Sequence, residues 1–475
     1  MKARFLQGTV YSVGAMACST AGVLAAGKLL TNTLTPAQVG QFALLLLCAE
    51  FMGTLANLGL PVTLPKLLQS HAGADRTRLL SSVFTLQLAT ALTLGFAGIV
   101  AAALGRQWLP LVAAWLPLPL PLLAVLPVLL IAVALRDFLL ASTPGLHQYA
   151  HRAAAILLMA GLQVIFFAAL FLGHADAPLP FAVSNLFAVT AGATLLARTV
   201  PRPAPADWGV AWAQVRFSAP LFANNLLNFI YQRADTLLVV YFLGIGTAAI
   251  FEMAKRIPGV VTRFFVAALV PYLPSVAELL HRGERARAGH VLRRASALAA
   301  YTGFGITLAA VAVQEPLLRL LFTADYAGAT PVLGPLLIAA CLAVQAGILG
   351  QVLIALERPR QVMYINAGMA LLSVALNAVL LPRFGLAGAG WSAVAGALLS
   401  YVLQRQAVAR AGIAVPGGQV MLIHALFIAG YVLLYWLGDL SLLAAGVVIV
   451  FATGGLAAGA APLAEARALI EKVRP

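Results

Sequence analysis

Ten charged side chains lie inside long apolar stretches of the sequence, where a charge is costly. A charge near the middle of a membrane-spanning helix costs about 2.5–3.5 kcal/mol on insertion scales, so such residues face a bundle interior or a water-filled cavity. Basic groups in that setting bind anions, and carboxylates pair with bases or bind cations. The ten residues are Lys28, Glu50, Arg136, Asp137, Arg233, Asp235, Glu252, Lys255, Arg256 and Arg263.

The stretch 248–277 carries the most informative pattern. Glu252, Arg256 and Arg263 stand at positions i, i+4 and i+11, so they line one face of a helix. At about 1.5 Å per residue, Arg263 lies roughly 22 Å along the stretch, beyond its centre. Its guanidinium needs an anion, which is either a diphosphate ligand or a carboxylate on another helix such as Glu50. Arg256 can pair with Glu252 in its own helix.

Four basic residues are therefore predicted to bind an anionic group. They are Arg263, Arg256, Arg233 and Lys28. Lys28 lies near one end of its stretch, so the alternative is that its ammonium extends to the membrane surface.

Three acids are weaker candidates for coupling to an ion gradient. Asp235 is either such a group or part of a local charge pair with Arg233, and Glu50 is either a coupling site or a structural partner of an arginine. Asp137 follows Arg136 directly. Because adjacent residues do not face each other on a helix, each is expected to need another partner.

The composition identifies the kind of element that must position these residues. The chain has 475 residues, of which 62% are hydrophobic and 9% charged, with a mean hydropathy of +0.96. A soluble domain carries about 25% charged residues, so soluble enzymes are excluded. We expect an all-α polytopic membrane protein. Its 14 predicted spans are 8–30, 39–64, 80–104, 121–141, 153–173, 179–198, 217–242, 248–277, 292–313, 331–355, 361–381, 386–407, 419–437 and 441–460.

The distribution of basic residues gives the topology. Of the 30 Lys and Arg residues, 21 fall in one set of alternate loops and termini, and only Arg106, Arg319 and Arg383 fall in the opposite loops. The positive-inside rule then predicts that both termini are cytoplasmic. The first apolar run is expected to remain as a helix and not to be a cleaved signal peptide.

An internal repeat predicts the domain organisation. At an offset of 209 residues, Leu64-Pro65 aligns with Leu273-Pro274, and Asp75-Arg76-x-Arg78 aligns with Glu284-Arg285-x-Arg287. We predict two pseudo-symmetric six-helix lobes, 1–213 and 214–412, followed by two extra helices and a cytoplasmic tail in 413–475. Transporters are often built from such repeats, with the substrate site between them. The two extra helices are expected to offer a groove for a lipid tail.

Several motifs resemble a known family, the polysaccharide (Wzx-type) flippases of the multidrug/oligosaccharidyl-lipid/polysaccharide exporter superfamily. The resemblance covers nearly the whole chain. The segments that carry it are 34–42, 57–61, 233–238, 250–256, 315–322 and 380–390.

This resemblance implies a flippase that moves an undecaprenyl-diphosphate-linked oligosaccharide across the bacterial inner membrane by alternating access, for surface polysaccharide or O-antigen assembly. The six bases and four acids within the spans agree, because a cationic cavity suits a diphosphate lipid. The alternatives are a cation-coupled multidrug exporter of the same superfamily and a polytopic glycosyltransferase or ligase.

The expected partners are the lipid-linked substrate, membrane lipids and polysaccharide-assembly proteins, with no nucleic acid. The sequence has no phosphate-binding loop, no metal-spaced histidine cluster and no nucleophile elbow. We therefore expect no enzyme activity and no cofactor other than a proton or sodium gradient.

Overall fold

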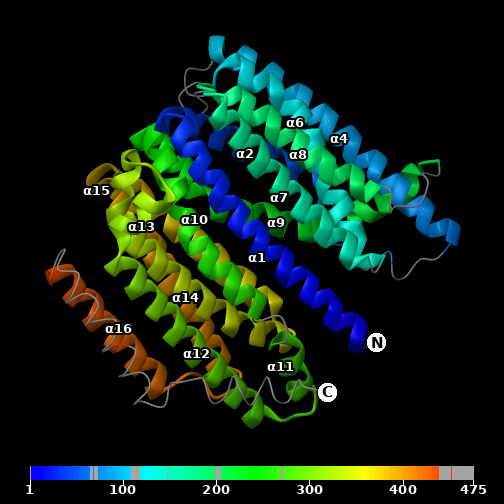
Figure 1. Cartoon of the computed structure of the whole chain (residues 1–475). Coiled ribbons are helices and arrows are strands. Elements are labelled where there is room, and N and C mark those ends of the chain that lie inside the picture. The colour runs from blue at the N-terminus through cyan, green and yellow to red at the C-terminus, as the bar shows by residue number, and fades with distance from the viewer. Residues whose placement is uncertain are drawn as a thin grey trace. The chain divides into compact units, whose positions relative to one another are not determined.

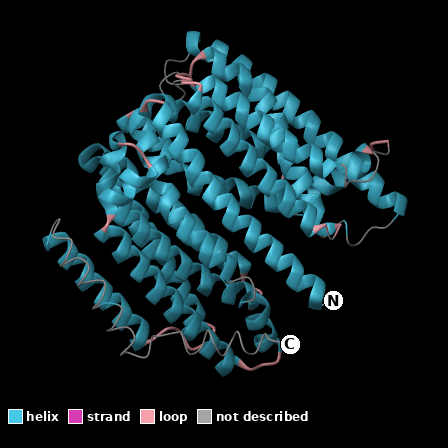
Figure 2. Ribbon diagram, viewed as in Figure 1, coloured by secondary structure: helices cyan, strands magenta, loops and turns pink. Residues whose placement is uncertain are grey.

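The structure is a computed structural model in which every regular element of the described residues is a helix (Figures 1 and 2). It describes residues 2–61, 63–64, 68, 73–108, 118–146, 148–197, 205–268, 272–437 and 451. Within these residues, nine helices have the length and apolar character needed to cross a membrane. The predicted all-α polytopic class is therefore confirmed. The predicted span 441–460 lies outside the described residues, apart from residue 451.

Helices account for nearly all of the described chain because a bilayer offers no water to satisfy backbone polar groups. Their bounds are α1 Lys2–Thr33, α2 Pro36–Asn57, α4 Gly73–Trp108, α6 Leu120–Gly145, α7 Tyr149–Leu172, α8 Pro178–Ala197, α9 Trp208–Leu243, α10 Ile245–Ala268, α11 Tyr272–His281, α12 Arg285–Ala312, α13 Gln314–Leu321, α14 Thr330–Ala355, α15 Pro359–Arg410 and α16 Gly418–Leu437, with a 3₁₀ helix at Ala324–Ala329.

The chain forms two compact units. The first unit comprises Met1–Glu252 with Leu321–Asp325, and the second comprises Met253–Leu320 with Tyr326–Pro475. The boundary falls within α10. The lobe limits 1–213, 214–412 and 413–475 remain a prediction.

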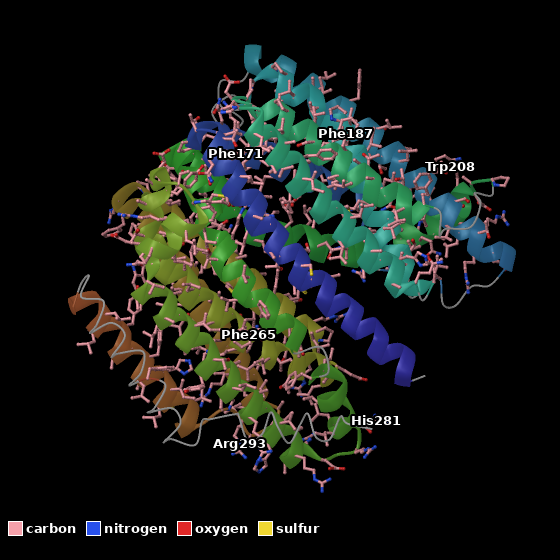
Figure 3. The ribbon with its side chains drawn as sticks, in the orientation of Figure 1. Phe171, Phe187, Trp208, Phe265, His281 and Arg293 are labelled. Carbon is pink, nitrogen blue, oxygen red and sulfur yellow. The ribbon has the colours of Figure 1, made fainter. Side chains whose placement is uncertain are left out.

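In the first unit, α1 packs on α7, α7 packs on α8, and α6 lies against α2, α4 and α8. Small residues permit the close approaches. A methyl group on Gly40 of α2 would lie 2.2 Å from the carbonyl oxygen of Ile245. The outward side chains are apolar, among them Phe171 and Phe187, which Figure 3 labels. An apolar exterior is what lipid requires.

In the second unit, α14 packs on α15 and α12, and α16 packs on α12. Gly390 of α15 is needed because a Cβ there would lie 2.8 Å from Cβ of Pro335 on α14. The long α15 is two helices joined at Gly385, whose φ of 57° and ψ of −142° are readily adopted only by glycine.

Three helices of the first half begin 209 or 210 residues before a helix of the second half, close to the offset of the predicted repeat. The matched starts are Pro36 of α2 with Ile245 of α10, Leu120 of α6 with Thr330 of α14, and Tyr149 of α7 with Pro359 of α15.

Candidate functional site

The first unit contains an ion-pair cluster that joins α2, α9 and the start of α10. Arg233 of α9 extends one nitrogen, Nη2, to Oε2 of Glu50 on α2 at 2.7 Å. Its other terminal nitrogen, Nη1, lies 3.6 Å from Oε2 of Glu252 on α10. The fork of the guanidinium thus engages two carboxylates on different helices, a geometry that lysine cannot reproduce.

Thr236 joins the same cluster from the next turn of α9. Its hydroxyl donates to Oε1 of Glu252, and its backbone N–H donates to Oδ1 of Asp235 at 2.7 Å. Arg233 and the acids Glu50, Asp235 and Glu252 therefore lie together at these three helices. The side chains of Glu50 and Arg233 are 44% and 30% exposed, against 17% for Glu252. Of the two carboxylates that Arg233 contacts, Glu50 is thus the more exposed.

A second polar chain crosses α4, α2 and α6. The side-chain amide of Gln87 donates to Oδ1 of Asn57 at 3.0 Å, and Nδ2 of Asn57 donates to Oδ2 of Asp137 at 3.0 Å. Arg136 supplies the other end, with Nε donating to Oδ1 of Asp137 at 2.9 Å. Gln87 and Asn57 are buried, so this chain lies inside the first unit.

The expectation that Arg136 and Asp137 need separate partners is therefore wrong. The arginine side chain is long enough to fold along the helix surface and reach its neighbour in sequence, with Nη2 also 2.8 Å from Oδ1. Asp137 does have a further partner, Asn57, on another helix.

Lys28 contacts a segment far along the chain. Its ammonium donates to the backbone carbonyl of Phe322 at 2.9 Å, and the lysine is half-buried. Thr323 Oγ1 donates to the carbonyl of Thr31 at 3.3 Å in the same region. These contacts tie residues after α13 to the end of α1. The sequence contained no signal for a carbonyl partner 294 residues away.

The remaining predicted basic residues lie farther along α10, in the second unit. Arg256 is half-buried and Arg263 is exposed. Next to Arg263, the side chains of α10 and α12 enclose an apolar pocket of about 430 Å³ lined by Val260, Val261, Phe264, Phe265 and Ile306. The structure thus places Arg233 and Lys28 in the first unit, and Arg256 and Arg263 in the second.

The start of α9 is held by one acid. Asp207 accepts hydrogen bonds from the backbone N–H groups of Gly209 at 2.8 Å and Val210 at 3.2 Å, and it pairs with Arg78 of α4. The hydrogen bond from Val210 contributes most to lowering the pKa of Asp207, and Gly209 and Arg78 lower it further against an opposing effect of desolvation. Asp207 therefore stays ionised at the loop between α8 and α9.

No group of three or more His, Cys, Asp or Glu side chains that could hold a metal ion is present among the described residues. Sequence reasoning missed Asn57, Gln87 and Thr236, which complete the polar chains. Their signal is a polar side chain in an otherwise apolar helix, which interhelical hydrogen bonding requires.

Solved structures share this fold. The lipid II flippase MurJ, in an inward closed conformation, superposes with a TM-score of 0.73 at 9% identity, over 94% of this chain and 97% of that one. A multidrug resistance MATE family transporter of the MOP superfamily, facing inward, gives a TM-score of 0.61 at 16% identity, over 82% and 95%. A MOP superfamily transporter from Pyrococcus furiosus, described as having a binding pocket of reverse polarity, gives 0.53 at 14% identity, over 86% and 95%.

No curated protein matches the sequence. The sequence pattern of one family, described as "Polysaccharide biosynthesis protein", matches residues 29–331. This is well over half of the chain, and it agrees with the resemblance to polysaccharide flippases that the motifs carry. The chain is a multi-pass membrane protein that belongs to the polysaccharide biosynthesis protein family.

Proposed function

We propose that this protein is a flippase that moves an undecaprenyl-diphosphate-linked oligosaccharide from the inner to the outer leaflet of the bacterial inner membrane. The observation that carries the proposal is that Arg263 on α10 is exposed. In the predicted span 248–277, Arg263 lies beyond the centre. An exposed base at that predicted depth suits an anionic headgroup that crosses the membrane. Family membership in polysaccharide biosynthesis supports the same substrate class.

The basic residues have different tasks in this proposal. Arg263, Arg256 and Lys28 attract the diphosphate. Arg233 is already paired with Glu50 and Glu252, so a phosphate can reach it only by displacing Glu50, the more exposed carboxylate. Arg233 therefore exchanges partners during transport and does not hold the headgroup at rest.

Transport would occur by alternating access, in which the two halves of the internal repeat rock about the substrate. The energy would come from a proton or sodium gradient. Glu50, Asp235 and Asp137 are the candidate coupling residues, because each lies in a helix of membrane length and contacts other polar groups there. Both termini would be cytoplasmic, and polysaccharide-assembly proteins are candidate partners.

The second candidate function is a cation-coupled multidrug exporter. The cluster of Glu50, Asp235 and Glu252 around Arg233 favours it, since an acidic site binds organic cations. The MATE fold that the chain shares is compatible with either function.

Deletion of the gene in the source bacterium tests the proposal. We expect lipid-linked oligosaccharide to accumulate on the cytoplasmic face and surface polysaccharide to be lost, with rescue by the wild-type gene and by Arg263→Lys but not by Arg263→Ala. Membrane insertion of each variant is verified by its abundance in membrane fractions.

Other outcomes would identify other functions. If the deletion strain has normal surface polysaccharide and is more sensitive to many drugs, the flippase function is rejected and the exporter function is supported. Accumulation of a shorter or unligated glycan on the outer face would indicate a glycosyltransferase or ligase.

A further inference from the structure

The apolar pocket of the second unit has the size of a ligand site. Its volume of about 430 Å³ lies within the range of about 300–1,000 Å³ that is typical of small-molecule sites. Four of its five lining side chains come from one stretch of α10, and Ile306 faces them from α12. Phe265, labelled in Figure 3, is one of the four.

One close approach between α10 and α12 lies beside the pocket. A Cβ on Gly303 of α12 would lie 3.5 Å from Cζ of Phe265, so the phenyl ring of Phe265 reaches the bare backbone of α12 at that level. Ile306 follows one turn later and lines the pocket. Phe264 and Ile306 are 63% and 46% exposed, whereas Val261 is 8% exposed, so the pocket is open at its rim and closed at its floor.

A basic residue borders this apolar space. Arg263 follows Val260 by three residues, so its side chain is a neighbour of one pocket residue on the same face of the helix. Arg263 is exposed. A pocket without polar lining, next to a guanidinium, is complementary to an amphiphile that carries a hydrocarbon chain and an anionic head.

The depth of Arg263 distinguishes between possible lipids. The hydrocarbon core of a bilayer is about 30 Å thick, so phosphates of resting phospholipids lie about 15 Å from its centre. Arg263 is predicted to lie beyond the centre of the span 248–277. A lipid whose phosphate meets Arg263 is therefore one whose head has left the membrane surface.

We propose that this pocket binds part of the hydrocarbon chain of a polyprenyl diphosphate lipid while Arg263 contacts the diphosphate. The inference rests on the proposed function and deepens it, since it assigns the tail of the substrate to α10 and α12. The sequence suggested instead a groove formed by the last two helices, and the second of these lies outside the described residues apart from residue 451.

Photo-crosslinking tests the proposal directly. The protein is purified and placed in phosphatidylcholine nanodiscs with radiolabelled C55 polyprenyl diphosphate, and p-benzoylphenylalanine replaces either Phe264 or Leu298. Leu298 is the matched control, because it lies on α12, is 37% exposed and is not part of the pocket lining. We expect at least tenfold more label at position 264 than at position 298.

Competition identifies the occupant. Unlabelled C55 polyprenyl diphosphate should remove the crosslink, whereas equimolar phosphatidylglycerol or inorganic diphosphate should leave most of it. If phosphatidylglycerol competes equally well, bilayer lipids occupy the pocket and the proposal is overturned. Equal labelling at positions 264 and 298 also overturns it.

Filling the pocket gives an independent measurement. Ile306→Trp should weaken binding of C55 polyprenyl diphosphate at least tenfold and leave binding of inorganic diphosphate unchanged, whereas Leu298→Trp should change neither. If the Ile306→Trp protein folds and binds C55 polyprenyl diphosphate as the wild type does, the proposal is refuted. If this variant does not fold, the crosslinking result decides.

The two proposals fail separately. A crosslink at position 264 without rescue of polysaccharide export would retain the pocket and reject the flippase. Rescue of export without the crosslink would retain the flippase and reject the pocket.

Discussion

Arg233 on α9 and Glu50 on α2 form an ion pair at 2.7 Å although 183 residues separate them in sequence. The same guanidinium reaches Glu252 near the start of α10, so one side chain links α2, α9 and the part of α10 that belongs to the first unit. Both partners of the pair are part-exposed, which distinguishes it from a sealed structural contact.

Removal of the acid tests the structural part of this relationship. Surface ion pairs contribute about 0–1 kcal/mol and loss of one partner of a buried pair costs about 3–5 kcal/mol, so this part-exposed pair predicts a loss of about 1–3 kcal/mol for Glu50→Gln. The measurement is the thermal midpoint in detergent. Glu315→Gln is the matched control, because Glu315 and Arg319 form an exposed pair at 3.6 Å, and it should change the midpoint very little.

A charge swap separates structure from transport. The double variant Glu50→Arg with Arg233→Glu should recover part of the stability that either single variant loses, since the pair is restored in reverse. It should not recover export, because the proposed exchange of Glu50 for phosphate requires the base on α9. Full recovery of export by the swapped protein would contradict the role given to Arg233.

The buried polar chain makes a second prediction. Asn57→Leu removes a donor to Asp137 and an acceptor for Gln87, so it should destabilise the protein by about 1–3 kcal/mol. Gln163→Leu is the matched control, since Gln163 donates to Asn185 at 3.0 Å and the pair includes no charge. If Gln163→Leu lost more stability than Asn57→Leu, the hydrogen bond from Asn57 to Asp137 would not be the stronger of the two contacts.

Close helix approach makes a third prediction. Gly40→Ala places a methyl group 2.2 Å from a backbone oxygen of Ile245 that cannot rotate away, so it should destabilise by about 1–3 kcal/mol or more. Gly161 lies in α7, and a methyl group added there would meet no atom within 4 Å. Gly161→Ala should therefore be neutral or stabilise the protein by up to about 1 kcal/mol. Equal melting behaviour of the two variants would argue against the packing of α2 described above.

The capping acid makes a prediction about pH. The pKa of Asp207 is lowered by folding, so its contribution to stability is fully present above the ordinary carboxyl pKa of about 3.9 and is lost as pH falls through the folded value. Asp207→Ala should therefore lower the thermal midpoint at pH 7. It should have little effect at a pH below the folded pKa of Asp207, where the carboxyl group is protonated. Asp207→Asn retains a side chain able to cap α9, so at neutral pH it should be milder than alanine. A deficit in Asp207→Ala that is the same at every pH would exclude the ionised carboxylate as the cause.

The sequence by itself determined the fold class and the family. Apolar stretches of membrane length leave the backbone no stable form in lipid other than a helix or a closed barrel, and the spacing of charges identified the residues that lipid cannot accommodate. The motifs that resemble polysaccharide flippases led to the family that the sequence pattern over residues 29–331 then confirmed.

Only the tertiary structure decided which charges meet. Glu50 was considered for Arg263 and lies against Arg233, and Arg136 folds back onto Asp137, which helix geometry alone argued against. Which charges pair between helices depends on how each helix is rotated about its axis and on the angle at which helices cross. Every apolar side chain in the interface contributes to both, so the spacing of residues along one helix does not predict them. The pocket beside Arg263 depends likewise on where α12 crosses α10, because Gly303 permits contact at one turn and Ile306 leaves space at the next.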